Sequence, residues 1–451
     1  MKKNLPNIVI VICHDLGQQL GCYGVDYVRS DHIDDFADSA IRFAHSFCAA
    51  PQCSPSRSTL YTGRFPHANG VVGLTHDGFA NDLKPGEVHL AQILKQFGYQ
   101  THLFGIQHES SSSERCGYEY IYPEGRCDQV ADDFVDFMAR KAEARRPFFA
   151  QVGFFEPHRP FPHEGIQPLP HDKVSIPPYL LDIPVVREDL ADMEASTVAV
   201  DRAFGRILES IRNSKFVDET IIVFTVDHGI AFPHAKMTLY DPGINVALIL
   251  SIPGLPGGIV YKEMISNADL MPTLLELVGI PIPDNLHGRS FRNLLIGEKY
   301  QANPAVFAEK TYHTYYDPMC AIRTPEWKLI ANFENAPWQE TSPDYENNAK
   351  GYVEVSKALD VPYEVQYHPP FELFNLMDDP FETRNLAKDP AYQETRDELA
   401  VQLRDWMEKT QDPLLAGPMA QGAYVERMRW FKALGMQDRL DLCEKANPSS
   451  A

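Results

Sequence analysis

The chain has 451 residues, and its 62 acidic and 41 basic side chains give a formal charge of −21 at pH 7. A surface this acidic repels polyanions, which argues against a nucleic-acid-binding protein. Hydrophobic residues make up 44% and charged residues 23%, which is ordinary globular usage and argues against disorder. The length predicts one large domain together with a smaller one.

The cysteines and the apolar runs argue against a disulfide-rich protein and a membrane protein. The eight cysteines have no regular spacing and do not predict a disulfide framework. The first apolar run, Ile8–Ile12, is too short for a signal peptide, and no small-residue cleavage site follows it. We therefore expect a cytoplasmic protein, or a periplasmic one if a leader was removed. No apolar stretch reaches the length of about 18 residues that spans a membrane, so we expect no membrane segment.

Short apolar runs alternate with helical patterns along most of the chain. This alternation is typical of a mostly parallel sheet with helices on both faces. The predicted strands are Ile8–Ile12, Thr101–Gly105, Phe148–Phe155, Thr220–Thr225 and Val246–Ile252. The predicted helices are His32–Ser39, Val88–Phe97, Asp132–Arg145, Arg187–Ser210 and Asp269–Leu277.

The composition changes after about Pro318. Short antiparallel strands are expected within residues 321–330 and 372–376, and an amphipathic helix over Tyr392–Lys409. The Pro- and Tyr-rich stretch Asn335–Pro370 is too long for a simple hairpin loop. We expect it to be a long connection between strands that has a functional or a packing role. We therefore expect a main domain of residues 1–318 and a small α+β subdomain of residues 319–451.

Polar residues follow most of the predicted strands of the main domain. In open α/β sheets, ligands bind beyond the carboxyl ends of the strands. We therefore expect four polar segments to converge in one site. They are His14-Asp15, His108-Glu109, Glu156-Pro157-His158-Arg159 and Asp227-His228.

The most specific motif is Cys53-Ser54-Pro55-Ser56-Arg57, which continues to Thr62-Gly63-Arg64. It resembles the type I sulfatase signature C-x-P-S-R-x-x-x-x-T-G-R, in which a maturation enzyme oxidises the cysteine to formylglycine. If Cys53 opens a helix, Arg57 lies one turn on along the same face, and the helix N-terminus adds positive potential. The alternative is that Cys53 is a small buried thiol.

The resemblance covers nearly the whole chain and is strongest to the sulfamidase (N-sulfoglucosamine sulfohydrolase) group and to bacterial polysaccharide sulfatases. It implies an alkaline-phosphatase-like α/β fold: a large, mostly parallel sheet between helices, with a smaller C-terminal α+β subdomain. Besides the signature, the segments that carry it are residues 69–74, 147–149, 156–159, 224–233, 372–376 and 379–386.

The resemblance also implies one divalent metal ion, bound by the formylglycine of residue 53, by two acids after the first strand and by a late pair. The late pair, Asp227-His228, fits the pattern. The early pair is His14-Asp15 where the family has two aspartates. A site with two histidines is softer than the oxygen cage that suits Ca²⁺, so we expect Mn²⁺ or Zn²⁺ to compete with it. The alternative is that His14 lies near the metal without binding it.

Three further positions match residues that sulfatases use in catalysis. The resemblance implies that His108 contacts the hydrated aldehyde, that His158 lies near the leaving group as a general acid, and that Lys236 contacts sulfate. Sulfatases commonly place a lysine two residues before the first of these histidines, and this chain has Ile106 there. His234 is a candidate to replace part of that role, or a solvated loop residue.

Other polar residues are candidates for substrate contact, with surface or packing roles as the alternative. They are His76, Glu109, Glu309 and His313. The function implied is hydrolysis of a sulfate ester or sulfamate, on a sulfated small molecule or saccharide, after activation by a formylglycine-generating enzyme. A phosphodiesterase or phosphonate monoester hydrolase of the same superfamily is the main alternative. A binding protein with an unmodified Cys53 is the non-enzymatic one.

Overall fold

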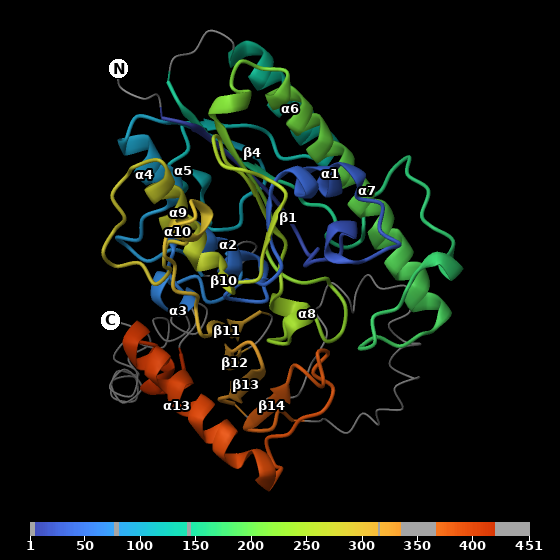
Figure 1. Cartoon of the computed structure of the whole chain (residues 1–451), viewed down its shortest axis with the longest axis vertical. Coiled ribbons are helices and arrows are strands. Elements are labelled where there is room, and N and C mark those ends of the chain that lie inside the picture. The colour runs from blue at the N-terminus through green and yellow to red at the C-terminus, as the bar shows by residue number, and fades with distance from the viewer. Residues whose placement is uncertain (1–4, 76–80, 142–145, 314–315, 335–366, 420–451) are drawn as a thin grey trace, which may run out of the picture.

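The computed structural model describes residues 5–75, 81–141, 146–313, 316–334 and 367–419. Its centre is an eight-stranded sheet with the strand order β5-β4-β6-β1-β7-β8-β2-β9 (Figure 1). Neighbouring strands are parallel except where β8 pairs with β7 and with β2. The strands are β1 (Asn7–Cys13), β2 (Ile41–Phe43), β4 (Gln100–Gly105), β5 (Tyr120–Ile121), β6 (Phe148–Gly153), β7 (Thr220–Val226), β8 (Leu248–Ser251) and β9 (Ile259–Tyr261).

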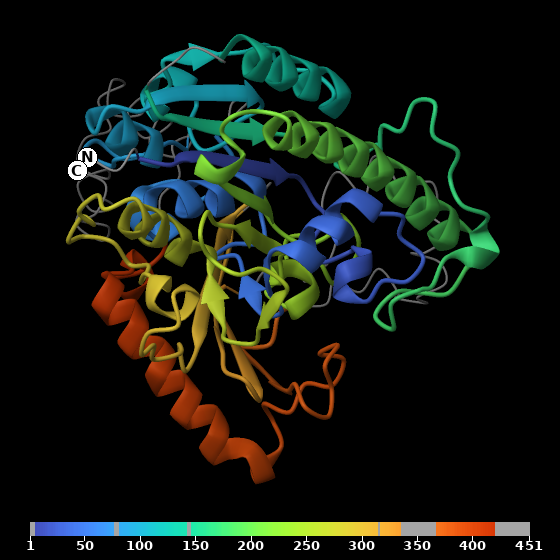
Figure 2. The ribbon, with the colours of Figure 1, turned by 45° about the horizontal axis from the view of Figure 1, so that its top comes forward.

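Helices cover both faces of this sheet, as the alternating pattern predicts. Val9 and Val11 of β1 face a core with α1, α6 and α7, while Ile8 and Ile10 face a core with α2, α4 and α9. Figure 2 shows the sheet between these two layers. The helices are α1 (Asp31–Ser39), α2 (Cys53–Thr62), α3 (Pro66–Asn69), α4 (Leu90–Gln96), α5 (Ser113–Cys116), α6 (Cys127–Arg140), α7 (Pro184–Arg212), α8 (Asp241–Ile244), α9 (Leu270–Leu277) and α10 (Arg292–Leu295).

The expected strands and helices of this domain are present, with shifted ends. The helix expected from Asp132 already begins at Cys127, because its first turn carries the buried Val130 and Ala131. The strand expected to reach Phe155 ends at Gly153, where the chain turns into the Glu156 loop. The short strands β3 (Ser46–Phe47) and β10 (Ile265–Ser266) form a separate parallel pair that the sequence pattern did not reveal.

A second, antiparallel sheet has the order β11-β12-β13-β14 and packs against α13, which is red in Figure 1. The expected antiparallel strands and helix are confirmed. The sheet begins before the boundary expected after residue 318, which falls inside β12. The elements are β11 (Val306–Tyr312), β12 (Tyr316–Arg323), β13 (Trp327–Asn332), β14 (Phe371–Asn375) and α13 (Gln393–Thr410). None of the helices within the described residues has the length and apolar character needed to cross a membrane.

Candidate active site

The two central strands bring the early and late polar pairs together. β1 and β7 are parallel neighbours, and their last paired residues are Cys13 and Val226. The segments that follow them therefore leave the sheet side by side. The backbone N–H of Asp15 donates to Asp227 Oδ1 at 3.0 Å, which closes the gap between the two loops. The expected convergence of these pairs is confirmed.

Helix α2 adds the signature motif to the same edge. The helix begins at Cys53, as expected, and Arg57 follows one turn later. Cys53 Sγ lies 3.3 Å from His228 Nε2, and Arg57 Nε donates to Asp227 Oδ2 at 3.0 Å. All ten residues of α2 are buried, so the motif forms part of the core beneath the site.

Two buried carboxylates organise the cluster. Asp15 Oδ2 accepts a hydrogen bond from Lys236 Nζ at 2.8 Å, and its Oδ1 lies 3.2 Å from His228 Nε2. Asp227 Oδ2 lies 2.9 Å from His14 Nδ1. The backbone of Asp15 has a φ of 48°, a left-handed conformation that aspartate tolerates better than most residues.

The protonation states follow from burial and charge. Burial, together with the charge of Arg57, holds the pKa of His14 well below its ordinary value. Burial acts to raise the pKa of Asp227, but the neighbouring His228, His14 and Arg57 outweigh it and hold that pKa well below its ordinary value. The cluster therefore presents a neutral imidazole beside an ionised carboxylate, which are the forms in which both groups bind metals.

The donor set fits a divalent metal ion. One potential ligand atom each from His14, Asp15, Cys53 and Asp227 lies within 4.8 Å of the others. His14 Nε2 and Asp15 Oδ1 are buried and make no hydrogen bond to the described residues. Leaving buried polar atoms unsatisfied costs about 1–3 kcal/mol each, and a shared cation would satisfy both.

The cluster also has buried donors that suit an oxyanion. Arg57 is fully buried, and its Nη1 and Nη2 make no hydrogen bond to the described residues. A guanidinium with unused N–H groups matches the geometry of a tetrahedral oxyanion. This arrangement, one helical turn from Cys53, suits a tetrahedral oxyanion.

His108 and His158 stand over the cluster. The His108 ring packs edge-on against His14, with the ring centres 4.9 Å apart. His158 Nε2 lies 3.3 Å from Lys236 Nζ, while its Nδ1 lies 2.7 Å from the carbonyl oxygen of Arg159. The side chain of His158 is 16% exposed whereas that of Asp15 is fully buried, so this histidine lies at the mouth of the site.

The residues expected to contact substrate lie in different surroundings in the structure. Glu109 is buried, accepts from Gln151 Nε2 at 2.8 Å, and has its pKa raised by burial although Arg57 opposes the shift. His234 stacks on Tyr240 at 4.0 Å, and its Nε2 lies 2.8 Å from the carbonyl oxygen of Phe381, as a packing residue would. The position of His76 falls outside the described residues.

Glu309 and His313 belong to β11 and the residues just after it. The Glu309 carboxylate is 3% exposed and binds both the backbone N–H of His67 at 2.7 Å and its ring Nδ1. His67 Nε2 in turn lies 3.2 Å from the carbonyl oxygen of Thr410 at the end of α13. Glu309 thus joins α3 to the small sheet instead of reaching the Cys53 cluster. His313 is buried directly after β11.

Replacing Glu309 by glutamine is expected to lower the free energy of unfolding and leave KM for a sulfated substrate unchanged. Burial acts to lower the pKa of His67, but the Glu309 charge raises it, and the net shift is upward. The contribution of the His67–Glu309 pair to stability is therefore fully present below the pKa of about 6.5 that His67 has in the unfolded chain. It is lost as pH rises through the raised pKa of His67 in the folded chain. We expect a loss of about 2 kcal/mol at about pH 6 and less at about pH 9, measured by denaturant unfolding.

The matched control for this variant is Glu408→Gln, at an exposed pair with Arg404 on α13. Exposed pairs contribute about 0–1 kcal/mol, so its effect on stability is expected to be negligible. A raised KM in Glu309→Gln, with unchanged stability, would instead place this carboxylate in the substrate site.

The sequence interpretation assigned no role to two residues that hold the cluster in place. The Ser56 hydroxyl donates to the backbone carbonyl of Asp227. Asn267 donates to the Ser56 carbonyl at 3.0 Å and accepts from the backbone N–H of Ala49 at 3.0 Å. Ser56 could have been found because it lies within the signature motif. Nothing in the local sequence marks Asn267.

The sequence comparisons assign the chain to a family. Residues 6–280 match the sequence model described as sulfatase. The chain belongs to the sulfatase family. Residues 228–355 also match a model described as the C-terminal part of N-sulphoglucosamine sulphohydrolase. The expected enzyme class, a sulfuric ester hydrolase, is thereby confirmed.

This sulfatase is 28% identical to N-sulphoglucosamine sulphohydrolase of Homo sapiens, over 91% of this chain and 92% of the relative. It is 26% identical to an ulvan-active sulfatase of Formosa agariphila, over 92% of this chain and 82% of the relative. The solved structure of a phosphonate monoester hydrolase from Silicibacter pomeroyi matches with a TM-score of 0.71 at 20% identity, covering 90% of this chain and 96% of that chain. The structural match confirms the expected fold class.

Proposed function

We propose that the chain removes sulfate from a saccharide, as an ester or a sulfamate, with Cys53 converted to formylglycine as the nucleophile and one divalent metal ion bound beside it. The observation that carries the proposal is the fully buried Arg57, whose Nη1 and Nη2 make no hydrogen bond to the described residues and which lies one helical turn from Cys53. A buried cation with unused donors beside a nucleophile position favours a tetrahedral anion as the reacting group.

The metal and the modification would supply what a thiol cannot. A divalent ion held by His14, Asp15, Asp227, His228 and residue 53 would lower the pKa of a hydroxyl on residue 53 and draw charge from the sulfate oxygens. The modification requires a formylglycine-generating enzyme as a partner. Arg57 and Lys236 pair with the two carboxylates, Asp227 and Asp15.

Arg57 and Lys236 are suited to hold the sulfate in line with residue 53. Lys236 Nζ already lies 2.8 Å from Asp15 Oδ2, so its ammonium group stands at the edge of the cluster. Arg57 is anchored through Nε to Asp227, which leaves its Nη atoms for sulfate oxygens. Both cations are fixed before substrate arrives, which makes their stabilisation of developing negative charge effective.

His158 and His108 are suited to move protons. The His158 ring is oriented by the Arg159 carbonyl at Nδ1, which leaves Nε2 toward Lys236 and the mouth of the site. Because Nδ1–H donates to that carbonyl, Nε2 carries a proton when the ring is an imidazolium, and that proton can pass to the departing oxygen or nitrogen of the saccharide. His108, packed against His14, is placed to accept a proton from residue 53 when sulfate is released.

The saccharide class is taken from the relatives. One acts on N-sulphoglucosamine and another on ulvan, and each aligns with most of this chain. The test is release of inorganic sulfate from a panel of sulfated oligosaccharides that includes O-sulfated and N-sulfated glucosamine units. Turnover of simple aryl sulfates with no turnover across the panel would contradict a saccharide substrate.

Phosphonate or phosphodiester hydrolysis is the second candidate, because a phosphonate monoester hydrolase shares the fold. Sulfate and phosphoryl groups have similar size and shape, so the Arg57 site alone accepts either. The match of residues 6–280 to the sulfatase model favours sulfate. Comparing aryl sulfate, phosphonate and phosphodiester turnover on one preparation decides between them.

We further propose that His14 makes the metal site favour Mn²⁺ or Zn²⁺ over Ca²⁺. Its Nε2 is buried, neutral and without a hydrogen bond to the described residues, as a nitrogen ligand should be before the ion binds. His228 supplies a second imidazole at the same place. Nitrogen ligands favour transition metals over calcium. Elemental analysis that finds only calcium in protein purified without added metal would contradict this.

Replacing His14 by aspartate is expected to move the preference toward Ca²⁺ by about tenfold or more relative to Mn²⁺, because the substitution adds an anionic oxygen ligand. The same change places a third carboxylate beside Asp15 and Asp227, so the metal-free variant is expected to be less stable than the wild type. The measurement is the rise in thermal midpoint on titration with each metal, supported by calorimetry.

His14→Asn is the control that separates ligand charge from ligand type, because its amide oxygen is neutral. We expect His14→Asn to weaken Mn²⁺ binding without gaining Ca²⁺ affinity. Equal metal preferences in the wild type and in His14→Asp would show that the imidazole lies near the ion without binding it.

A further inference from the structure

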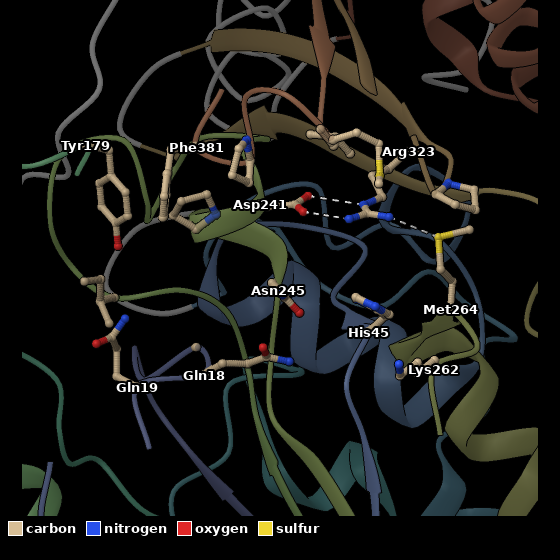
Figure 3. Close-up of a pocket in the computed structure, with 17 residues that line it drawn as sticks. Gln18, Gln19, His45, Tyr179, Asp241, Asn245, Lys262, Met264, Arg323 and Phe381 are labelled. Atoms are coloured by element: carbon tan, nitrogen blue, oxygen red, sulfur yellow. Dashed lines mark hydrogen bonds and ion pairs between the residues drawn. The ribbon is translucent and has the colours of Figure 1, made fainter. Parts of the chain in front are cut away.

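A cavity of about 530 Å³ lies between the main domain and the small sheet. Figure 3 shows α8 crossing its centre, with Tyr179 and Phe381 at one end and His45 and Lys262 at the other. Its size falls within the range of about 300–1,000 Å³ that is usual for small-molecule sites. The walls come from the segments after β1, β2, β9, β12 and β14, so the cavity exists only in the folded chain.

The cavity is separate from the Cys53 cluster. None of the proposed metal or catalytic residues lines it. Two of its lining residues, Gly17 and Ile230, follow the metal-site residues Asp15 and His228 closely in sequence, and the Gly17 N–H donates to the His228 carbonyl at 2.9 Å. The cavity therefore adjoins the loops that carry the active site, although its lining differs from that of the Cys53 cluster.

One end of the cavity carries a positive charge in a chain that is strongly acidic. Asp241 pairs with Arg323 Nη2 at 3.0 Å and with Lys328 Nζ at 2.6 Å, and Lys328 also pairs with Glu382 Oε1 at 2.7 Å, so these buried charges balance one another. Lys262 is exposed and forms no ion pair with any described residue. Lys262 therefore presents an uncompensated positive charge at one end of the cavity, which favours an anionic group there.

Amide groups and aromatic rings complete the walls. Asn245 Oδ1 is buried and makes no hydrogen bond to the described residues, and the side-chain amide of Gln19 also lines the cavity. At the other end, the rings of Tyr179 and Phe381 lie 6.1 Å apart, and Phe381 is 36% exposed. Unused amides bind hydroxyl groups, and exposed aromatic faces pack against the apolar faces of sugar rings.

We propose that this cavity is a second binding site for an acidic saccharide unit, in which Lys262 contacts a carboxylate or sulfate and Phe381 with Tyr179 packs against the sugar ring. Gln19 and Asn245 bind hydroxyl groups between these two ends. That this site holds a neighbouring unit of a glycan substrate rests on the proposed function. The binding of an acidic saccharide in the cavity does not depend on that function.

The site is also linked to the catalytic loop through His234. His234, two residues before Lys236, stacks on Tyr179 at 5.6 Å and binds the carbonyl oxygen of Phe381. A sugar seated on the two rings therefore rests against the segment that carries the proposed sulfate-binding lysine. His234 therefore positions the rings of Tyr179 and Phe381 relative to the Lys236 segment, and it does so without contacting substrate itself.

The test is calorimetric titration with trigalacturonate, an acidic saccharide that has no sulfate to release, and with the neutral maltotriose. We expect the full-length wild type to bind trigalacturonate at least about tenfold more tightly than maltotriose, because of the charge of Lys262. The double variant Lys262→Ala/Phe381→Ala is expected to lose about tenfold or more of the trigalacturonate affinity.

The matched control is Lys95→Ala/Phe97→Ala, which removes the same two side-chain types from the exposed end of α4. It is expected to bind both sugars as the wild type does, and thermal unfolding checks that both double variants fold. No binding of trigalacturonate, equal binding of the neutral sugar, or equal affinity in the two double variants would overturn the proposal.

Failure of this inference is distinct from failure of the proposed function. If sulfate is released from the oligosaccharide panel but trigalacturonate binding does not depend on Lys262 and Phe381, the second site is wrong and the proposed function stands. If binding depends on these residues but no saccharide is desulfated, the second site stands and the proposed function is wrong.

Discussion

Replacing Cys53 by alanine is expected to lower kcat/KM for sulfate release by about 10,000-fold or more, because no other side chain of the cluster replaces the nucleophile. Cys53 opens α2 with its Sγ 3.3 Å from His228, while Arg57 stands one turn behind it. The alanine methyl group fits the same buried position, so the fold is expected to persist. The measurement is steady-state kinetics on an aryl sulfate, with thermal unfolding to check stability.

Two controls accompany this variant. Cys22→Ala removes a half-buried thiol outside the cluster and is expected to retain activity. Mass spectrometry of the wild-type peptide is expected to show residue 53 lighter than cysteine by about 18 Da, as conversion to formylglycine requires. Full activity with an unmodified Cys53, or in Cys53→Ala, would contradict the proposed nucleophile.

Replacing Asp227 by asparagine is expected to lower kcat/KM by about 1,000-fold and the free energy of unfolding by about 3–5 kcal/mol. Asp227 accepts the backbone N–H of Asp15 and binds Arg57 through its second oxygen. Asparagine has one oxygen and one NH₂ group in place of the two carboxylate oxygens. Its NH₂ group would face either the backbone N–H of Asp15 or the Arg57 guanidinium, and both of these are donors. A fully buried Arg57 would then lack its charge partner.

The pH dependence of this effect has a definite sign. Because the folded pKa of Asp227 lies well below its ordinary value, its contribution to stability is present above the unfolded pKa of about 3.9 and is lost as pH falls through the folded value. Denaturant unfolding at neutral and acidic pH should therefore show the difference between wild type and variant shrinking in acid.

The matched control is Asp201→Asn on α7. Asp201 accepts the Ile33 N–H at 2.8 Å, and burial raises its pKa to about 6, so a neutral side chain is tolerated there. This variant is expected to keep its activity and most of its stability. Activity near the wild-type level in Asp227→Asn would show that the reaction takes place elsewhere.

The convergence of the site was predictable because it follows from sheet geometry. Parallel strands end at one edge, so His14, Asp15 and Asp227 meet once β1 and β7 are recognised as neighbours. The start of α2 at Cys53 was predictable from a signature with fixed spacing. Both are local patterns whose spatial consequence does not depend on distant partners.

β11 was missed because its polar residues hide its periodicity. Glu309, Lys310 and Thr311 are all buried, and their polar groups are satisfied by partners far away in sequence, such as His67 for Glu309. Three polar residues in a row predict an exposed loop unless those partners are known. For the same reason, Glu309 was taken as a candidate for substrate contact.

The second cavity was equally outside the reach of sequence patterns. Lys262, Tyr179 and Phe381 lie on different loops that no motif connects. His234 was a candidate to replace part of the role of the lysine that is missing at Ile106, yet the structure stacks it on Tyr240. Contacts between loops depend on how the two sheets pack, and periodicity within a segment carries no information about that packing.

The register of β1 and β7 determines how this site responds to disturbance. The two strands are hydrogen-bonded from Asn7 and Thr220 to Cys13 and Val226, at the centre of the sheet. Backbone amides in such a position exchange with solvent only when the core opens. Asp15 and Asp227 follow directly on these two strands, and the hydrogen bond from the Asp15 N–H to Asp227 Oδ1 joins them. We therefore expect the separation of the two carboxylates to persist as long as the pairing of β1 and β7 does.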